Sequence, residues 1–306
     1  MENLCDKLNK VKESSRKLAV LDSEIRTNIL FSMADEIRTH SAEILLANQK
    51  DLSIAKENNL DESRLSILTL TAGNVESMAK SLEQMAKLPD PVGERISYSA
   101  RKDGLIIEKK WIPLGVVSVV YEARPDVVTD SAGICMRTGN ALILCGSRHS
   151  FNTDLATANI LKKALSDNNI DTDFITYIED TSHDMKIFIA RQKRCVDLMI
   201  IRGGVPSVDS LISAATVPYI VAGEGNCHIF IDDSADYEMA ADIVINSKVP
   251  RPKACNAAET ILISRAWADK YFEALAELLH DNGLKLFGCE NAVKFTDHIV
   301  PAEENH

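Results

Sequence analysis

The feature that most restricts the fold of this chain is a regular alternation of short apolar runs and helical segments from about residue 115 onward. The runs "GVVSVVY", "ALILC", "FITYI", "VDLMII" and "PYIVAG" have the length and β-branched content of buried strands, and amphipathic segments separate them. Strands that alternate with helices form βαβ units, which build a parallel sheet covered by helices. We therefore predict an α/β fold with a Rossmann-type parallel sheet.

The segments on either side of this alternation have other patterns. Apolar residues recur at helical spacing from Leu18 to Ile37, and Ser41 is a plausible N-cap for the next helix, so the first ninety or so residues are predicted to be helical. After the break at "PDPVG", "GLIIEKKWIP" is typical of an extended arm. "HIFIDD", "YEMAADIVINSK", "ETILIS" and "ADKYFEALAELLHDNG" continue the alternation beyond the first sheet, and the last of these ends in a glycine suited to a C-cap.

Length, charge and hydropathy exclude several classes of protein. A chain of 306 residues is expected to form two domains. Lys and Arg number 34 against 45 Asp and Glu, a net charge of −11, and no basic patch stands out, which argues against a nucleic acid or an anionic membrane as partner. The apolar runs are too short to span a bilayer, and the N-terminus lacks the apolar core of a secretory signal. We predict a cytoplasmic protein.

The cysteines and histidines do not have the spacing of metal ligands. There are 7 of each, with no CxxC pair and no HxxxH pair. This dispersion argues against a zinc site and against a disulfide framework. Most of the cysteines are interpreted as small core residues.

Three loops of the predicted sheet carry small and polar residues directly after a strand: "YEARPDVV", "CGSRHS" and "RGGVPS". Ligands of such sheets bind at the carboxyl ends of the strands, where glycine and serine let the backbone approach an anion and the next helix offers free N–H groups. Arg148 and Arg202 suit phosphate. The alternative is that these are ordinary glycine-rich turns. Three in one sheet favour a nucleotide site, although neither GxGxxG nor a P-loop is present.

The stretch "KVPRPKACNAAETILIS" places Cys255 after a basic, proline-containing turn and next to Asn256. A thiolate forms near neutral pH when positive groups are close, and Lys248, Arg251 and Lys253 are close in sequence. A reactive thiol beside a nucleotide site indicates thioester chemistry coupled to hydride transfer. The alternative is a structural core cysteine.

Two long segments carry a family resemblance. "IPLGVVSVVYEARPDVVTDSAGICMRTGNALILCGS" and "KVPRPKACNAAETILIS" resemble the gamma-glutamyl phosphate reductases, also called glutamate-5-semialdehyde dehydrogenases, of the aldehyde dehydrogenase superfamily. "ILLANQKDL", "LPDPVG" and "GNCHIFIDDSAD" extend the resemblance over nearly the whole chain. It implies an aldehyde dehydrogenase-like fold, with a cofactor-binding domain formed by residues 1–94 and 114–232, an arm for oligomerisation at 95–113 and a catalytic domain at 233–306.

The resemblance also implies a reaction, the NADPH-dependent reduction of L-glutamyl 5-phosphate to L-glutamate 5-semialdehyde in proline biosynthesis. Cys255 would be the nucleophile, and its backbone N–H and the Asn256 amide would stabilise the oxyanion. Arg124 is predicted to bind the substrate with its loop neighbours Glu122 and Asp126, and the alternative is that it forms structural ion pairs with them. Implied partners are glutamate 5-kinase, by channelling, and further copies of the chain.

The cofactor loops are the remaining part of the predicted site. The residues expected to contact NADPH are Gly139, Asn140, Cys145, Gly146, Ser147, Arg148, Gly203 and Gly204. Glu224 is interpreted as a solvated loop acid, since this reduction needs no activated water.

The chain departs from the family pattern at three places. Cys145 stands where a basic residue is usual, Ile201 where proline is common, and the chain stops at "VPAEENH" where relatives continue. We therefore expect a C-terminally truncated reductase with an incomplete catalytic domain and little activity of its own. The alternative is a non-catalytic, cofactor- or partner-binding remnant of the family.

Overall fold

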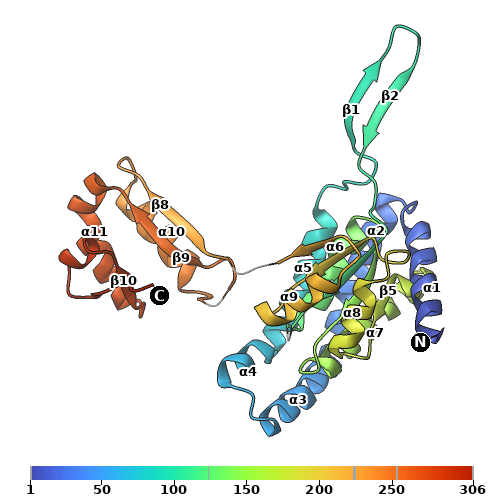
Figure 1. The fold of residues 1–306 in the computed structure, drawn as a ribbon, viewed down its shortest axis with the longest axis horizontal. Coiled ribbons are helices and arrows are strands. Elements are labelled where there is room, and N and C mark those ends of the chain that lie inside the picture. The colour runs from blue at the N-terminus through green and yellow to red at the C-terminus, as the bar shows by residue number, and fades with distance from the viewer. Residues whose placement is uncertain (1, 123, 223–224, 253, 305–306) are drawn as a thin grey trace. The chain divides into compact units, whose positions relative to one another are not determined.

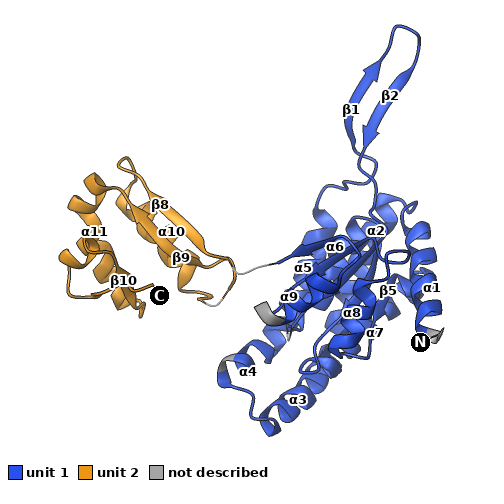
Figure 2. Ribbon diagram, viewed as in Figure 1, with its two compact units in different colours: residues 1–222 blue, residues 223–306 orange. Residues whose placement is uncertain are grey.

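The computed structural model describes residues 2–122, 124–222, 225–252 and 254–304. The chain divides into two compact units, Met1–Ala222 and Gly223–His306, which Figure 2 colours separately. The sequence-based boundary after residue 232 differs from this division. Strand β8 (Cys227–Ile231) pairs with a strand of the second unit, so it groups with that unit.

Helices form the first part of unit 1, as the apolar periodicity predicts. They are α1 (Glu2–Leu18), α2 (Ser23–Thr39), α3 (Ser41–Glu57), α4 (Glu62–Leu68) and α5 (Ala72–Lys87). Ile29, Met33 and Ile37 are buried at helical spacing on α2 and belong to the main core. The prediction of Ser41 as an N-cap is wrong by one residue. His40 is the only residue between α2 and α3, and its carbonyl accepts the first hydrogen bond of α3.

The predicted arm is an antiparallel hairpin of β1 (Arg95–Ala100) and β2 (Ile106–Lys110) (Figure 1). Gly104 in its turn has a φ of +87°, a conformation that favours glycine. Every residue of both strands is exposed. The exposed residues include apolar ones in and beside the strands: Ile96, Tyr98, Leu105, Ile106, Ile107, Trp111 and Ile112.

The centre of unit 1 is a 5-stranded sheet in the order β5-β4-β3-β6-β7, with every neighbouring pair parallel. Its strands are β3 (Val116–Val120), β4 (Ala141–Cys145), β5 (Ile175–Tyr177), β6 (Leu198–Ile201) and β7 (Tyr219–Val221). β3 and β4 are buried throughout, which explains their uninterrupted apolar sequences. Because the chain crosses from β5 on one side of β3 to β6 on the other, the strand order reverses at β3.

Helices follow the strands in the predicted order: α6 (Asp126–Arg137), α7 (Phe151–Asp167), α8 (His183–Ala190) and α9 (Val205–Ala214). A short 3₁₀ turn, η1 (Thr172–Phe174), precedes β5. α6 packs against α7, and α8 packs against α9. Since parallel crossovers are right-handed, the two pairs cover opposite faces of the sheet.

Unit 2 is a smaller α/β unit with its own core. Its elements are β8, α10 (Tyr237–Lys248), β9 (Ala258–Ile263), α11 (Arg265–Asp281), β10 (Leu286–Gly288), η2 (Ala292–Lys294) and β11 (Ile299–Pro301). β8 pairs with β9 and β10 with β11, both in parallel. Val244, Trp267 and Leu275 lie in the core, and Gly283 follows α11 at a φ of +79°, as the C-cap prediction requires.

Candidate active site

The three polar loops lie at the same edge of the sheet. They follow β4, β3 and β6, which are adjacent parallel strands, so their carboxyl ends meet where the strand order reverses. This is the position at which open α/β sheets bind their ligands. The structure thus brings together Glu122, Arg124, Asp126, Gly146, Ser147, Arg148, Gly203 and Gly204, as the sequence predicts.

Two of the predicted loop glycines are required by close packing. A Cβ at Gly146 would lie 2.5 Å from Oδ2 of Asp154 and 2.9 Å from the hydroxyl of Tyr177. A Cβ at Gly203 would lie 3.0 Å from Oε1 of Glu122. The backbone of both loops therefore rests directly on neighbouring side chains, as expected where main-chain groups rather than side chains line a ligand site.

Glu122 connects the loops after β3 and β6. Its Oε1 accepts a hydrogen bond of 3.0 Å from the N–H of Gly204, which is the N-cap residue of α9. A carboxylate at a helix N-terminus is stabilised by the free N–H groups and the helix dipole. Glu122 therefore has a structural role in this structure, where the sequence predicted a contact to substrate.

Positive charge and helix N-termini gather at this edge. Helices α6, α7 and α9 begin there, and their first turns offer N–H groups to an anion. Arg124 and Arg202 are half-buried and Arg148 is exposed. Among the described residues, Arg124 forms no ion pair with Glu122 or Asp126, so the alternative of a structural ion pair is not supported. The edge fits the phosphate groups of a dinucleotide.

A buried polar cluster supports the loop after β4. Oδ2 of Asp154 accepts hydrogen bonds from Tyr121 at 3.0 Å and from Ser150 at 2.9 Å, and Oδ1 has no partner within the described residues. Burial raises the pKa of Asp154 well above its ordinary value, which favours the neutral form of this carboxyl group. The hydroxyl of Tyr177 is also buried, and no partner for it is found in the described part of the chain. The sequence gives no local signal for this cluster, because its members come from different elements.

Cys145 is the last residue of β4 and is only 3% exposed. Burial raises its pKa to about 11, and its nearest polar neighbour is the hydroxyl of Ser118, 3.8 Å from Sγ. A neutral, buried thiol offers no charge to a phosphate group. The predicted contact between Cys145 and the cofactor is therefore not supported by its position.

Gly139 and Asn140 lie at the opposite edge of the sheet from the three loops. They precede β4, and Oδ1 of Asn140 accepts a hydrogen bond of 2.9 Å from the N–H of Gly115 just before β3. Gly139 has a φ of +70° in the turn after α6. Both residues form the connection into β4, and the structure does not place them with the other predicted cofactor residues.

Cys255 lies in unit 2, in a turn directly before β9. The N–H of Ala257 donates to the carbonyl of Ala254 at 2.9 Å, which closes the turn and leaves Cys255 and Asn256 exposed. A Cβ at Gly225 would lie 2.1 Å from the carbonyl oxygen of Cys255, so glycine is needed where these two segments meet. Cys255 is thus not a core cysteine.

The basic residues near Cys255 differ in their surroundings. Lys248 forms an ion pair of 2.9 Å with Glu259, so its charge is largely neutralised, whereas Arg251 is exposed. Lys253 and Glu224 lie outside the described residues. Of the two described basic residues, Arg251 is the one without an ion pair in the described part of the chain.

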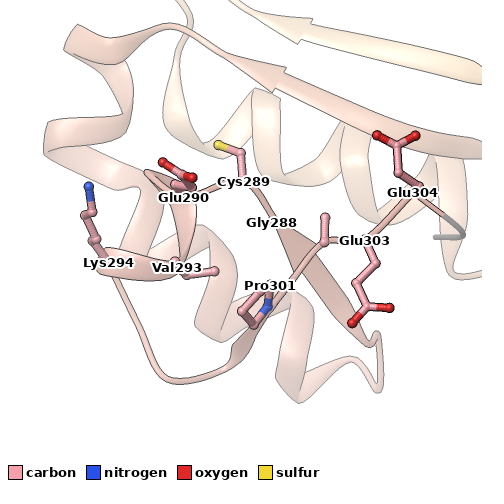
Figure 3. Close-up of a pocket in the computed structure, with 9 residues that line it drawn as sticks. Gly288, Cys289, Glu290, Val293, Lys294, Pro301, Glu303 and Glu304 are labelled. Carbon is pink, nitrogen blue, oxygen red and sulfur yellow. The ribbon is translucent and has the colours of Figure 1, made fainter.

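A second exposed cysteine of unit 2 was not identified from the sequence. Cys289 lies beside η2 at a shallow hollow with Glu290, Lys294 and Glu303 (Figure 3). Backbone N–H groups of Ala292 and Asn291 lower the pKa of Cys289. The sequence signal that could have identified it is weak, since only a three-residue 3₁₀ turn follows it.

The described residues contain neither a cluster of metal ligands nor a membrane-spanning helix. No group of three or more His, Cys, Asp and Glu side chains is arranged to hold a metal ion in this part of the chain. No helix among the same residues has the length and apolar character needed to cross a membrane.

Comparison with known proteins agrees with this geometry. The aldehyde dehydrogenase family model matches residues 7–284. Gamma-glutamyl phosphate reductase of Anoxybacillus flavithermus is 42% identical over 286 residues, which are 94% of this chain and 69% of the relative. The reductase of Carboxydothermus hydrogenoformans is 37% identical over 304 residues, 99% of this chain and 73% of the relative. The crystal structure of gamma-glutamyl phosphate reductase from Thermotoga maritima superimposes with a TM-score of 0.87 at 32% identity, covering 99% of this chain and 73% of that one.

The sheet with its ligand edge and the separate cysteine-bearing unit define an oxidoreductase of the aldehyde dehydrogenase class, whose members generally use NAD(P). Within that class, the chain belongs to the gamma-glutamyl phosphate reductase family.

Proposed function

We propose that this chain acts in proline biosynthesis by reducing L-glutamyl 5-phosphate to L-glutamate 5-semialdehyde and phosphate, with NADPH as the reductant. The observation that carries the proposal is the exposed Cys255 in the turn before β9, in a chain whose parallel sheet has three glycine- and arginine-bearing loops at one edge. The names and identities of the relatives support the choice of substrate.

Cys255 acts as the nucleophile. Its thiolate attacks the C5 carbonyl carbon of the acyl phosphate, the bond from carbon to the phosphate oxygen breaks, and phosphate leaves with the electron pair. A thioester to Cys255 remains. When bound, NADPH supplies the hydride that reduces this thioester to the aldehyde. Loss of the aldehyde returns the thiolate of Cys255.

A negative oxygen forms when the carbonyl carbon becomes tetrahedral. The N–H of Cys255 and the side-chain amide of Asn256 are the donors we assign to it, since both belong to the same exposed turn. Loss of one such donor raises the barrier by about 3 kcal/mol in other acyl-transfer enzymes. Arg124 binds a phosphate or carboxylate of the substrate, because its planar guanidinium is free of ion pairs to Glu122 and Asp126 within the described residues.

The loops after β3, β4 and β6 hold the phosphates of NADPH. Gly146, Ser147, Gly203 and Gly204 provide close backbone approach, and Arg148 provides charge. The fit is supported by the glycine positions, where a side chain would collide with Asp154 or Glu122.

The hairpin of β1 and β2 is the segment that we assign to self-association. Its strands are exposed along their whole length and carry apolar side chains such as Ile107 and Tyr98. Exposed strand edges pair readily with other strands, so a second copy of the chain is the expected partner.

The test is an assay in the reverse direction. The chain is given glutamate 5-semialdehyde, phosphate and NADP, and NADPH is followed by its absorbance. Since little activity is expected of this chain, we expect slow NADPH formation, which Cys255→Ser abolishes and the matched control Cys289→Ser preserves. Formation that persists in Cys255→Ser would overturn the role of the thiol. Binding of NADPH without any turnover would favour the alternative of a non-catalytic cofactor-binding protein.

A further inference from the structure

The carboxyl end of β4 has no charge of its own at the point where the cofactor loop begins. The strand ends at the neutral, buried Cys145, and the next residues are Gly146 and Ser147. Arg148 is exposed on the loop beyond them. A cation at the base of this loop therefore has to come from another element.

Lys186 on α8 is that cation. The chain leaves β5 at the carboxyl edge of the sheet, and α8 begins at that edge with Ser182 as its N-cap, so Lys186 lies near the start of the helix. Its side chain is half-buried. Burial lowers the pKa of Lys186, and the electrostatic interactions that oppose this come from Cys145 and Glu122. Lys186 is thus a half-buried lysine near the start of a helix that begins at the same edge as the loops after β3 and β4, and the electrostatic effects of Cys145 and Glu122 agree with this placement.

The charge of Lys186 is not neutralised by an ion pair within the described residues. Glu122 is the carboxylate that affects the pKa of Lys186. Its Oε1 accepts a hydrogen bond of 3.0 Å from the N–H of Gly204. Lys248 shows the contrast, since its ammonium group forms an ion pair of 2.9 Å with Glu259. A half-buried ammonium group without a partner carboxylate is available to an anionic ligand.

We propose that Lys186 binds a phosphate group of the dinucleotide cofactor from α8 and supplies the positive charge that Cys145 does not provide at the end of β4. This inference rests on the proposed use of NADPH. The phosphate is either one of the pyrophosphate pair, which NADH shares, or the 2′-phosphate, which NADPH alone carries.

The experiment measures dissociation constants for NADPH and NADH by fluorescence titration of the full chain, so turnover is not needed. Lys186→Met should weaken NADPH binding by about ten-fold, the effect of losing one charge-assisted contact, whereas Lys186→Arg should keep most of the affinity. Lys162→Met is the matched control. Lys162 is also a half-buried lysine on a helix of unit 1, but its charged neighbours are Lys7, Asp173 and Glu179.

The outcomes separate the two proposals. An equal loss for NADPH and NADH assigns Lys186 to the pyrophosphate, and a loss for NADPH alone assigns it to the 2′-phosphate. Unchanged affinity for both in Lys186→Met, or an equal loss in Lys162→Met, overturns the role of Lys186 and leaves the proposed function intact. If the unaltered chain binds neither nucleotide, both proposals fail. A thermal unfolding scan of each variant ensures that only folded protein is compared.

Discussion

The hydroxyl of Tyr121, just after β3, donates a hydrogen bond of 3.0 Å to Oδ2 of Asp154 on α7. The two residues are 33 positions apart in sequence, and both are buried. A Cβ at Gly146 would lie 3.1 Å from this hydroxyl and 2.5 Å from Oδ2. The hydrogen bond therefore forms part of the surface on which the cofactor loop rests.

Replacing Asp154 by Asn should stabilise the protein at neutral and alkaline pH. The pKa of Asp154 is raised in the folded state by burial, so its stabilising contribution is complete below its unfolded pKa of about 4 and is lost as pH rises through the folded pKa. Asn has a similar shape and does not titrate. We expect the free energy of unfolding of Asp154→Asn, relative to that of the unaltered protein, to increase from pH 5 to pH 8, since the variant has no carboxyl group to titrate.

Thermal unfolding at several pH values would measure this difference. Asp180→Asn is the control, and its stability relative to the unaltered protein should fall as pH rises through the acidic range. The reason is that hydrogen bonds from the side chain and the backbone N–H of Ser182 lower the pKa of Asp180. A loss of stability in Asp154→Asn that grows with pH would contradict a neutral Asp154.

The cysteines should differ strongly in their reactivity toward limiting iodoacetamide. Burial raises the pKa of Cys135 to about 12 and that of Cys145 to about 11, so both should remain unmodified in the native protein. Cys255 and Cys289 are exposed, and hydrogen bonds from backbone N–H groups lower the pKa of Cys289. We expect these two cysteines to react first, with the sites mapped by mass spectrometry.

The variant Cys289→Ser separates the two exposed thiols of unit 2. In this background the first adduct should form at Cys255, as the sequence predicts. If Cys135 or Cys195 reacts while Cys255 stays unmodified, the assignment of Cys255 as the nucleophile is wrong.

Removal of the Arg148 side chain should weaken the binding of NADPH more than the binding of NADH. Its guanidinium is exposed in the loop after β4, where it suits the additional phosphate of NADPH. Arg148→Ala is expected to weaken NADPH binding by about ten-fold and NADH binding much less. Arg16→Ala, which removes an exposed arginine of α1, is the control. An equal effect of Arg148→Ala on both nucleotides would reject a contact to the 2′-phosphate.

A charge in the hairpin should prevent self-association. Ile107 is 50% exposed in the middle of β2, and a carboxylate there would oppose its burial against another chain. We expect Ile107→Asp to shift the molar mass from light scattering toward that of one chain. Val20→Asp, at an apolar site that is 80% exposed outside the hairpin, should leave the mass unchanged. Unaltered association in Ile107→Asp would exclude the hairpin as the contact.

The sequence predicted the architecture of unit 1 because buried parallel strands are continuous apolar runs. β3 and β4 are buried at every position, and their sequences, VVSVV and ALILC, are almost entirely apolar. The same local signals located the three loops, since each directly follows such a run. Exposed β1, with the polar sequence "RISYSA", has no comparable pattern and was recognised only as part of an arm.

Local sequence was less informative about which residues lie together at the same end of the strands. Gly139 and Asn140 are as close to β4 in sequence as Gly146 and Ser147 are, yet they lie at the other edge because they precede the strand. Glu122, expected at the substrate, instead binds the N–H of Gly204. That contact depends on β3 and β6 being neighbours, which the order of elements along the chain does not specify.

The sequence by itself thus determined the class of fold, the family and the identity of the exposed cysteine turn. These follow from periodicity and from contiguous motifs, which are local properties of the chain. Only the tertiary structure decided that Tyr121 and Asp154 support the loop at Gly146, and that Cys145 is buried. Such relationships join residues from separate elements, and they depend on strand order and helix packing, which arise when distant apolar surfaces are buried together.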